Sequence, residues 1–235
     1  MSSIIKLCLS FLAISIFLSS NTLSADMLLN KGILNFYAGG VIRDDIEITN
    51  DGEEPLYLSI TTFKINNPEN SKPERIEMTD PRTSELLASP NKMIVSAGQK
   101  KILRIIVREA PGTVDQVYRI KIMPYSPPIK TGDKSKKQVG VKVLLGYELL
   151  AFLRPPNHQA KLKVKQEGKT LKVTNEGNTN TILRNIKQCQ DKDHCQEIKG
   201  KRLYAGQSID LKLPQAEGKI IIYKSVGAEF SLEEY

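Results

Sequence analysis

Few side chains in this sequence could carry acid–base, nucleophilic or metal chemistry. Among 235 residues there are two histidines, His158 and His194, and three cysteines. The sequence has no Gly-x-Ser-x-Gly, no phosphate-binding glycine-rich loop, no His-Glu-x-x-His and no Cys-x-x-Cys motif. A hydrolase whose site is assembled from residues distant in sequence is the remaining enzymatic alternative. We therefore expect a protein that is not an enzyme and that uses no cofactor.

The first 25 residues are typical of a secretory signal peptide. Lys6 supplies positive charge, residues 7–18 are an apolar run, and residues 19–25 are small and polar, ending at Ala25. The run is too short to cross a bilayer comfortably, although a retained membrane anchor is the alternative. No later segment approaches 18 apolar residues, so we expect an exported mature chain without membrane insertion.

Two cysteines remain after that cleavage, Cys189 and Cys195. An even pair in an exported chain predicts a disulfide, because the compartment beyond the membrane is oxidising. Two cysteines beside His194 could instead bind a metal, but a structural zinc usually needs four ligands. The sequence therefore favours a Cys189–Cys195 disulfide and no metal site.

The basic charge does not indicate nucleic-acid binding. Thirty-four Lys and Arg against 26 Asp and Glu give a net charge of +8. The tight cluster of Lys134, Lys136 and Lys137 lies in a stretch rich in turn residues, which is typical of a solvated loop. Aromatic residues do not alternate with the basic ones, as a base-stacking surface requires. We expect no nucleic-acid partner.

Strand patterns dominate the rest of the chain. Alternating or β-branched runs separated by turn residues occur at 41–49, 56–65, 100–107, 117–123 and 139–153. The tandem prolines after Arg154 mark a boundary, because proline cannot continue a central strand. Short strands resume beyond it. This pattern predicts an all-β protein with a signal peptide at 1–25 and two sandwich domains at 26–154 and 155–235.

The segment 139–153 is long for a strand and apolar on both faces along part of its length. Two interpretations remain open from the residues alone. It is either a central strand buried on both sides, or an edge strand whose apolar row serves another protein by strand addition. The row in question is Val139, Val141, Val143, Leu145 and Tyr147.

Several short motifs give the chain a family resemblance. In the first predicted domain they are Tyr37-Ala38-Gly39-Gly40, Ser89-Pro90 before Ala97-Gly98-Gln99, Ile102-Leu103-Arg104-Ile105, Tyr118-Arg119-Ile120 with Pro124 downstream, and Phe152-Leu153-Arg154-Pro155. In the second they are residues 175–180 (NEGNTN) and 200–206 (GKRLYAG). Their order and spacing resemble the periplasmic chaperones that assemble pili in the chaperone–usher pathway, in the less common branches of that family.

The resemblance implies two immunoglobulin-like domains in a boomerang arrangement, a periplasmic location and no cofactor. Its implied partners are pilin subunits, which lack their last strand, and an outer-membrane usher. The chaperone fills the subunit's open groove with its own long strand. In this sequence the donor side chains would be Val139, Val141, Val143, Leu145 and Tyr147.

One family feature is missing. Typical members hold the subunit's C-terminal carboxylate with an Arg on the first strand and a Lys on the long strand, but Leu34 and Leu150 occupy the matching positions. We expect Arg119 to anchor the subunit instead, with Arg104 and Lys31 as weaker candidates. Arg154 is expected to order the domain junction.

A different class of function also fits an exported β-sandwich protein. An immunoglobulin-like adhesion or ligand-binding module would bind through its loops and would not associate with an usher. The apolar, two-faced segment 139–153 argues against this alternative, because a free module should protect such a strand.

Overall fold

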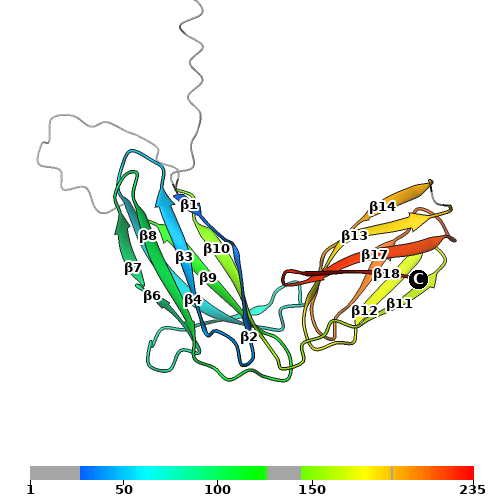
Figure 1. Ribbon diagram of the computed structural model, residues 1–235, viewed down its shortest axis with the longest axis horizontal. Coiled ribbons are helices and arrows are strands. Elements are labelled where there is room, and N and C mark those ends of the chain that lie inside the picture. Colours follow the sequence, from blue (N-terminus) through cyan, green and yellow to red (C-terminus); the bar gives the residue numbers. More distant parts are fainter. Residues whose placement is uncertain (1–26, 126–143, 192) are drawn as a thin grey trace, which may run out of the picture.

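A computed structural model describes residues 27–125, 144–191 and 193–235 of the protein. Within these residues every regular element is a β-strand. The strands form two β-sandwiches set at an angle to each other, which gives the boomerang outline seen in Figure 1. The predicted fold class is therefore confirmed: all-β, with two immunoglobulin-like sandwiches.

The first sandwich packs two sheets face to face. The smaller sheet has the strand order β1 (Met27–Leu29), β3 (Arg43–Asn50), β8 (Lys100–Val107) and β6 (Leu86–Ser89). The larger sheet has the order β2 (Ile33–Tyr37), β10 (Tyr147–Arg154), β9 (Gln116–Pro124), β4 (Leu56–Asn66) and β5 (Glu74–Glu77), with β7 (Lys92–Val95) beside the other end of β4. β2 and β10 run parallel, whereas the other neighbours are antiparallel.

Side-chain alternation builds the core between these sheets. Residues of one parity on each strand point inward, as in Leu58 and Ile60 on β4 and Ile120 and Ile122 on β9. Tyr118 belongs to the same inward row, and its hydroxyl donates to the carboxylate of Glu85 over 3.0 Å. Burial raises the pKa of the Tyr118 hydroxyl, so the donor form persists.

The second sandwich is smaller. One sheet has the order β11 (Leu162–Glu167), β12 (Thr170–Asn175) and β16 (Ser208–Lys212). The other has the order β14 (Cys195–Lys199), β13 (Thr181–Cys189), β17 (Lys219–Val226) and β18 (Glu229–Glu234), with β15 (Arg202–Leu203) also paired to β13. Its core is aliphatic and includes Leu171, Val173, Leu183, Ile186 and Ile222.

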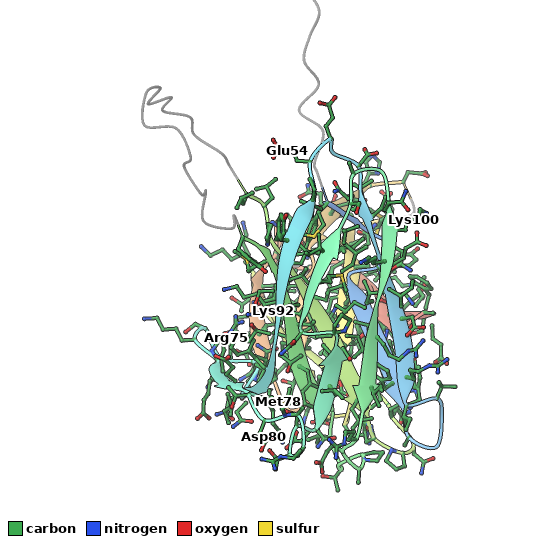
Figure 2. All side chains as sticks on the ribbon, turned by 90° about the vertical axis from the view of Figure 1, so that its left-hand side faces the viewer. Glu54, Arg75, Met78, Asp80, Lys92 and Lys100 are labelled. Carbon is green, nitrogen blue, oxygen red and sulfur yellow. A yellow bond between two sulfur atoms is a disulfide. The ribbon has the colours of Figure 1, made fainter. Side chains whose placement is uncertain are left out.

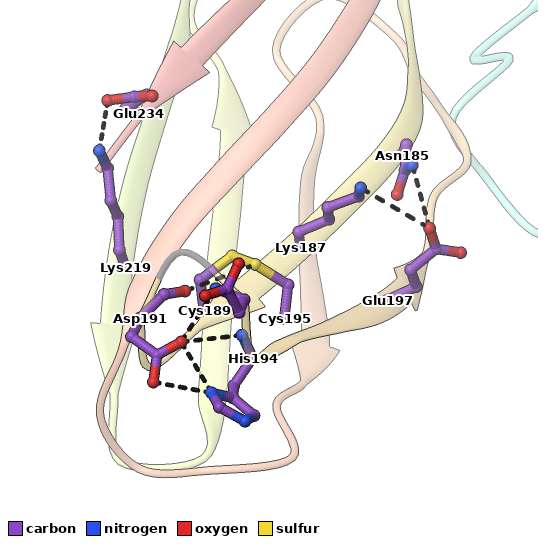
Figure 3. The surroundings of a disulfide bond; sticks show 10 residues. Asn185, Lys187, Cys189, Asp191, His194, Cys195, Glu197, Lys219 and Glu234 are labelled. Atoms are coloured by element: carbon purple, nitrogen blue, oxygen red, sulfur yellow. Dashed lines mark hydrogen bonds and ion pairs between the residues drawn. A yellow bond between two sulfur atoms is a disulfide. The ribbon is translucent and has the colours of Figure 1, made fainter.

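The predicted disulfide between Cys189 and Cys195 is confirmed. Figure 3 shows that it joins β13 to β14 at their hairpin. His194 lies in the same loop, where its Nδ1 is 2.8 Å from both carboxylate oxygens of Asp191. The hydrogen bond with His194 also holds the pKa of Asp191 below its usual value. Among the described residues, no group of three or more His, Cys, Asp or Glu side chains could hold a metal ion.

Arg154 orders the junction between the two sandwiches, as expected from the sequence. It is almost fully buried, and it donates to Asn35 Oδ1 from Nη2 over 2.8 Å and to Thr179 in the second sandwich. Asp115 lies 3.5 Å from its guanidinium and accepts hydrogen bonds from Thr179 and from the backbone of Asn180. A buried charge needs such partners, so this network connects the end of β10 to the second sandwich.

Four of the five predicted strands lie where the sequence placed them, as β3, β4, β8 and β9, with ends that differ by at most two residues. The fifth prediction, a strand over 139–153, is confirmed over 147–153 and wrong over 144–146. β10 begins at Tyr147, and residues 144–146 are not in a strand. The part of that prediction at 139–143 lies outside the described residues.

The reason for the late start of β10 is its neighbour β9. Continuing the register of Tyr147 with Ile122 would place Leu145 opposite Pro124. Tyr125 donates its N–H to Tyr57 on β4, so Pro124 is the residue whose backbone should face β10. Because proline has no N–H, a Leu145–Pro124 pair would lose one of its two hydrogen bonds, which disfavours continuing the ladder there.

The disulfide gives a prediction about stability. Replacing Cys189 and Cys195 together by Ala should lower the free energy of unfolding of the second sandwich by about 2 kcal/mol, because a short closed loop is released in the unfolded chain. Urea unfolding of the oxidised parent and of the variant measures this difference. Reducing agent should lower the parent to the level of the variant and leave the variant unchanged. Equal stability of the oxidised parent and the variant would contradict the prediction.

Candidate functional site

The inward-facing side chains of β10 are buried toward the C-terminal end of the strand and exposed toward its N-terminal end. Leu149, Ala151 and Leu153 are buried in the core of the first sandwich, with Leu149 only 1% exposed. Tyr147, of the same parity, is 36% exposed, and Leu145 is 63% exposed. The apolar row therefore continues past the end of the sandwich that covers it.

The two ladders of β10 begin at different residues. Pairing with β9 starts at Tyr147, whereas pairing with β2 starts at Leu150, whose N–H donates to Gly32 over 3.0 Å. In the described part of the chain, residues 147–149 therefore have a strand neighbour on the β9 side and none on the β2 side. The hydroxyl of Tyr147 donates to Met27 of β1, but β1 belongs to the opposite sheet.

The predicted donor row is therefore described at two of its five positions. Leu145 and Tyr147 lie at the exposed start of β10. Val139, Val141 and Val143 lie outside the described residues.

The other face of β10 points toward the second sandwich. Leu150 and Phe152 form a buried cluster there with Ile65 and Val117, against which Tyr204 of the second sandwich packs. A cleft of about 590 Å³ opens beside this cluster and is lined by both sandwiches. The bend between the two sandwiches, which we call the elbow, is thus apolar at this cluster.

Three charged side chains meet on this face next to Leu150. Glu148 of β10 accepts two hydrogen bonds from Arg75 of β5, one of them from Nη1 to Oε2 over 3.3 Å. Arg119 of β9 lies opposite Leu150 and places its Nη1 3.8 Å from the same Oε2. Figure 2 shows Arg75 at one edge of the first sandwich and Lys100 near the opposite edge.

The pKa of the Glu148 carboxyl lies below its usual value. The main cause is the hydrogen bonding from Arg75; desolvation opposes it, and the charges of Arg75, Arg119 and Lys121 add to it. The carboxylate therefore stays ionised to lower pH than an isolated glutamate. Three cations surround one anion, so the cluster has excess positive charge.

The other two anchor candidates lie elsewhere and already have partners. Arg104 is on β8 of the opposite sheet and holds both carboxylate oxygens of Asp45, at 2.9 and 3.0 Å. Lys31 precedes β2 and pairs with Asp44 over 2.7 Å. Of the three candidates, the structure brings Arg119 onto the face of β10 that borders the elbow.

The two leucines at the family's clamp positions do not face each other. Leu34 points into the core and is nearly inaccessible, whereas Leu150 lies on the opposite face of the sheet. The β2 residue paired with Leu150 is Ile33. Leu34 and Leu150 therefore cannot hold one ligand together, and Ile33, the residue beside Leu150, is equally unable to bind an anion.

Sequence reasoning missed Arg75 and Glu148. They are separated by 73 positions and come from strands at different places in the sheet order β10-β9-β4-β5. No local spacing marks such a pair. A charged residue in an otherwise apolar strand, as Glu148 is in β10, was the available signal.

Comparison with solved structures identifies proteins with the same fold. The class 5 fimbriae chaperone CfaA superposes with a TM-score of 0.65 at 19% identity, covering 88% of this chain and 98% of that chain. A chain in the complex of the Salmonella enterica SafA pilin with the SafB chaperone gives 0.63 at 17% identity, covering 91% and 97%. For the Acinetobacter baumannii CsuC–CsuE complex of a chaperone with a tip adhesion subunit, the values are 0.57 and 16%, covering 88% and 97%.

These likenesses show that the chain has the two-domain fold of fimbrial chaperones. No protein-family model and no curated protein sequence matches the chain. The part of the chain that the structure describes contains no helix with the length and apolar character that crossing a membrane requires.

The lowered pKa of Glu148 gives a prediction for the charge cluster. The ion pair with Arg75 should persist as the pH falls through 4.5, the ordinary glutamate value, and be lost only when the pH falls through the lower folded-state pKa. A carbon-13 NMR titration of the Glu148 carboxyl should give a midpoint below 4.5 in the parent. The midpoint should rise in Arg75→Ala. A parent midpoint at or above 4.5 would contradict the geometry.

Proposed function

We propose that this chain is a periplasmic chaperone that binds and stabilises pilin subunits by donor-strand complementation and delivers them to an outer-membrane usher. It would be exported by a signal peptide at 1–25. Residues 26–154 would form the domain that carries the donor strand, and residues 155–235 the second domain. A pilin and a tip adhesion subunit are the partners named for two of the proteins with this fold.

The observation that carries the proposal is the exposed continuation of the β10 row at Tyr147 and Leu145. An apolar row that leaves its own core can complete the core of an incomplete partner. Burying each Val or Leu contributes roughly 1.5 to 3 kcal/mol, so three to five residues between Val139 and Tyr147 would contribute about 5 to 15 kcal/mol gross. That is enough to stabilise a subunit that lacks a strand.

The backbone of β10 supports the same reading. A strand laid along the side of β10 that β2 leaves open would find unpaired ladder positions and would end where β2 begins, at Leu150. Strand addition supplies main-chain hydrogen bonds, and alternate side chains supply specificity. The binding site would thus be an edge of the fold, with no catalytic group and no cofactor.

Arg119 is the proposed anchor for the end of the subunit. It lies on β9 opposite Leu150, beside the point where the added strand would stop. Its guanidinium would take the subunit's C-terminal carboxylate or backbone carbonyls. Arg104 and Lys31 are weaker candidates, because each is already paired with an aspartate.

The donor role predicts that charge at the exposed row abolishes subunit binding. Leu145→Glu together with Val143→Glu should weaken the chaperone–pilin complex by more than 100-fold, since about 3 kcal/mol or more of apolar burial is lost. Co-purification from periplasm with mass spectrometry of the partner measures this.

The matched control is Ile102→Glu, which changes an exposed apolar residue on β8 of the opposite sheet and should leave the complex intact. Urea unfolding of the free double variant should match that of the parent. If the free double variant unfolds instead, the segment is part of the chain's own core and the donor role is wrong.

The anchoring role predicts a second loss. Arg119→Ala should weaken subunit binding by roughly 2 to 5 kcal/mol, the usual cost of truncating one member of a buried charged pair. Arg104→Ala removes the same charge from the opposite sheet and serves as the control. A loss below about 1 kcal/mol for Arg119→Ala would rule out anchoring by this residue.

A further inference from the structure

Arg75 and Arg119 share the Glu148 carboxylate unequally. Arg75 binds both carboxylate oxygens through its two terminal nitrogens. Arg119 approaches one oxygen at 3.8 Å, which is beyond hydrogen-bond distance. The two hydrogen bonds from Arg75 thus satisfy the Glu148 carboxylate, and the Arg119 guanidinium keeps N–H donors for another ligand.

We infer that Arg75 is a positioning residue that holds Glu148 away from Arg119, so that Arg119 stays available for the carboxylate of a bound subunit. This inference rests on the proposed anchoring role of Arg119. It gives a role to Arg75, although its strand β5 is not a neighbour of β10 in the sheet. It also explains why an acidic residue, Glu148, lies beside the proposed binding site for a carboxylate.

The path of the Arg75 side chain supports this role. β5 lies three strands from β10 in the sheet, so Arg75 must reach across β4 and β9 to meet Glu148. Its guanidinium lies over the ring of Phe63 on β4, 4.6 Å from the ring centroid. The aromatic face attracts the cation there, and the cation draws the Glu148 carboxylate toward the middle of the sheet. The carboxylate is thereby drawn away from the β2 side of β10, where a guest strand would lie.

The charges around Glu148 show what Arg75 prevents. Without Arg75, the nearest remaining cations of the cluster are Arg119 and Lys121. Glu148 would then pair with Arg119, because a guanidinium binds a carboxylate through two parallel hydrogen bonds. The anchor would be occupied by the chain's own glutamate, and an incoming carboxylate would have to displace it.

A titration of the whole mature chain tests the inference without a pilin. The probe is N-acetyl-valyl-leucine with a free carboxylate, followed through the Arg119 Nε–H signal in nitrogen-15 NMR. The same dipeptide with an amidated C-terminus is the ligand control. The free acid should shift the Arg119 signal to saturation, and the amide should not.

Variants at position 75 should weaken that binding. Arg75→Ala should raise the dissociation constant about 3- to 10-fold, and Arg75→Lys, which keeps the charge but loses the fork, should also raise it. Adding Glu148→Gln to Arg75→Ala should restore the parent value within about two-fold. Arg82→Ala removes an arginine that is paired with Asp80 in an exposed loop, and it should change nothing.

Three results would overturn the inference: unchanged binding in both Arg75 variants, no restoration by Glu148→Gln, or no shift of the parent's Arg119 signal by the free acid. The proposed chaperone function fails separately. A complex that survives charge at Leu145 would overturn that function. A failed titration beside a complex that is sensitive to charge at Leu145 would overturn the role of Arg75 and leave donor-strand complementation standing.

Discussion

An interior strand of a β-sheet has a hydrogen-bonding neighbour on each side, whereas an edge strand has only one. β10 has both neighbours only from Leu150 onward. Before that residue its β9 side is paired and its β2 side is open. The side chains follow the same division, because Leu149 is buried whereas Tyr147 and Leu145 are exposed. One strand therefore belongs to the core of its own sandwich at one end and offers an edge and an apolar row at the other. The proposed binding site depends on this mismatch between two ladders.

The opposite end of β10 is held firmly. Arg154 is buried between the sandwiches and connects the last residue of the strand to Asn35, Thr179 and Asp115. Because the C-terminal end of β10 is fixed at the elbow, the start of the strand at Tyr147 is held in a defined direction. The charge cluster around Glu148 lies between these two ends, on the face that borders the elbow cleft, so a guest strand stopping at Leu150 would end beside it.

Local rules were enough to predict much of this molecule. Alternation located β3, β4, β8 and β9, because each buries one face against the opposite sheet. The Cys189–Cys195 pair and the junction role of Arg154 also followed from residue type and position. The start of β10 did not, since an apolar run does not show where its neighbours' ladders end. Pro124, which lies on another strand, disfavours pairing at that point because it has no N–H to donate.

The charge cluster could not be predicted for a related reason. Arg75, Arg119 and Glu148 are distant in sequence and meet only through the strand order of one sheet. The sequence also did not show that Leu34 and Leu150 lie on opposite faces of the sheet, because that depends on the pairing of β2 with β10. Positions within strands were therefore predictable, but contacts across strands required the fold.

Hydrogen–deuterium exchange at the open edge of β10 tests the central claim most directly. Leu150 donates its N–H toward β2, so the N–H of Glu148, two residues earlier, lies on the same side of the strand. The account predicts that the Glu148 amide exchanges rapidly in the free chain and at least 100-fold more slowly once a pilin subunit is bound. The Leu150 amide should be protected in both states. A Glu148 amide that is already protected in the free chain, or that exchanges equally fast in the complex, would contradict the account.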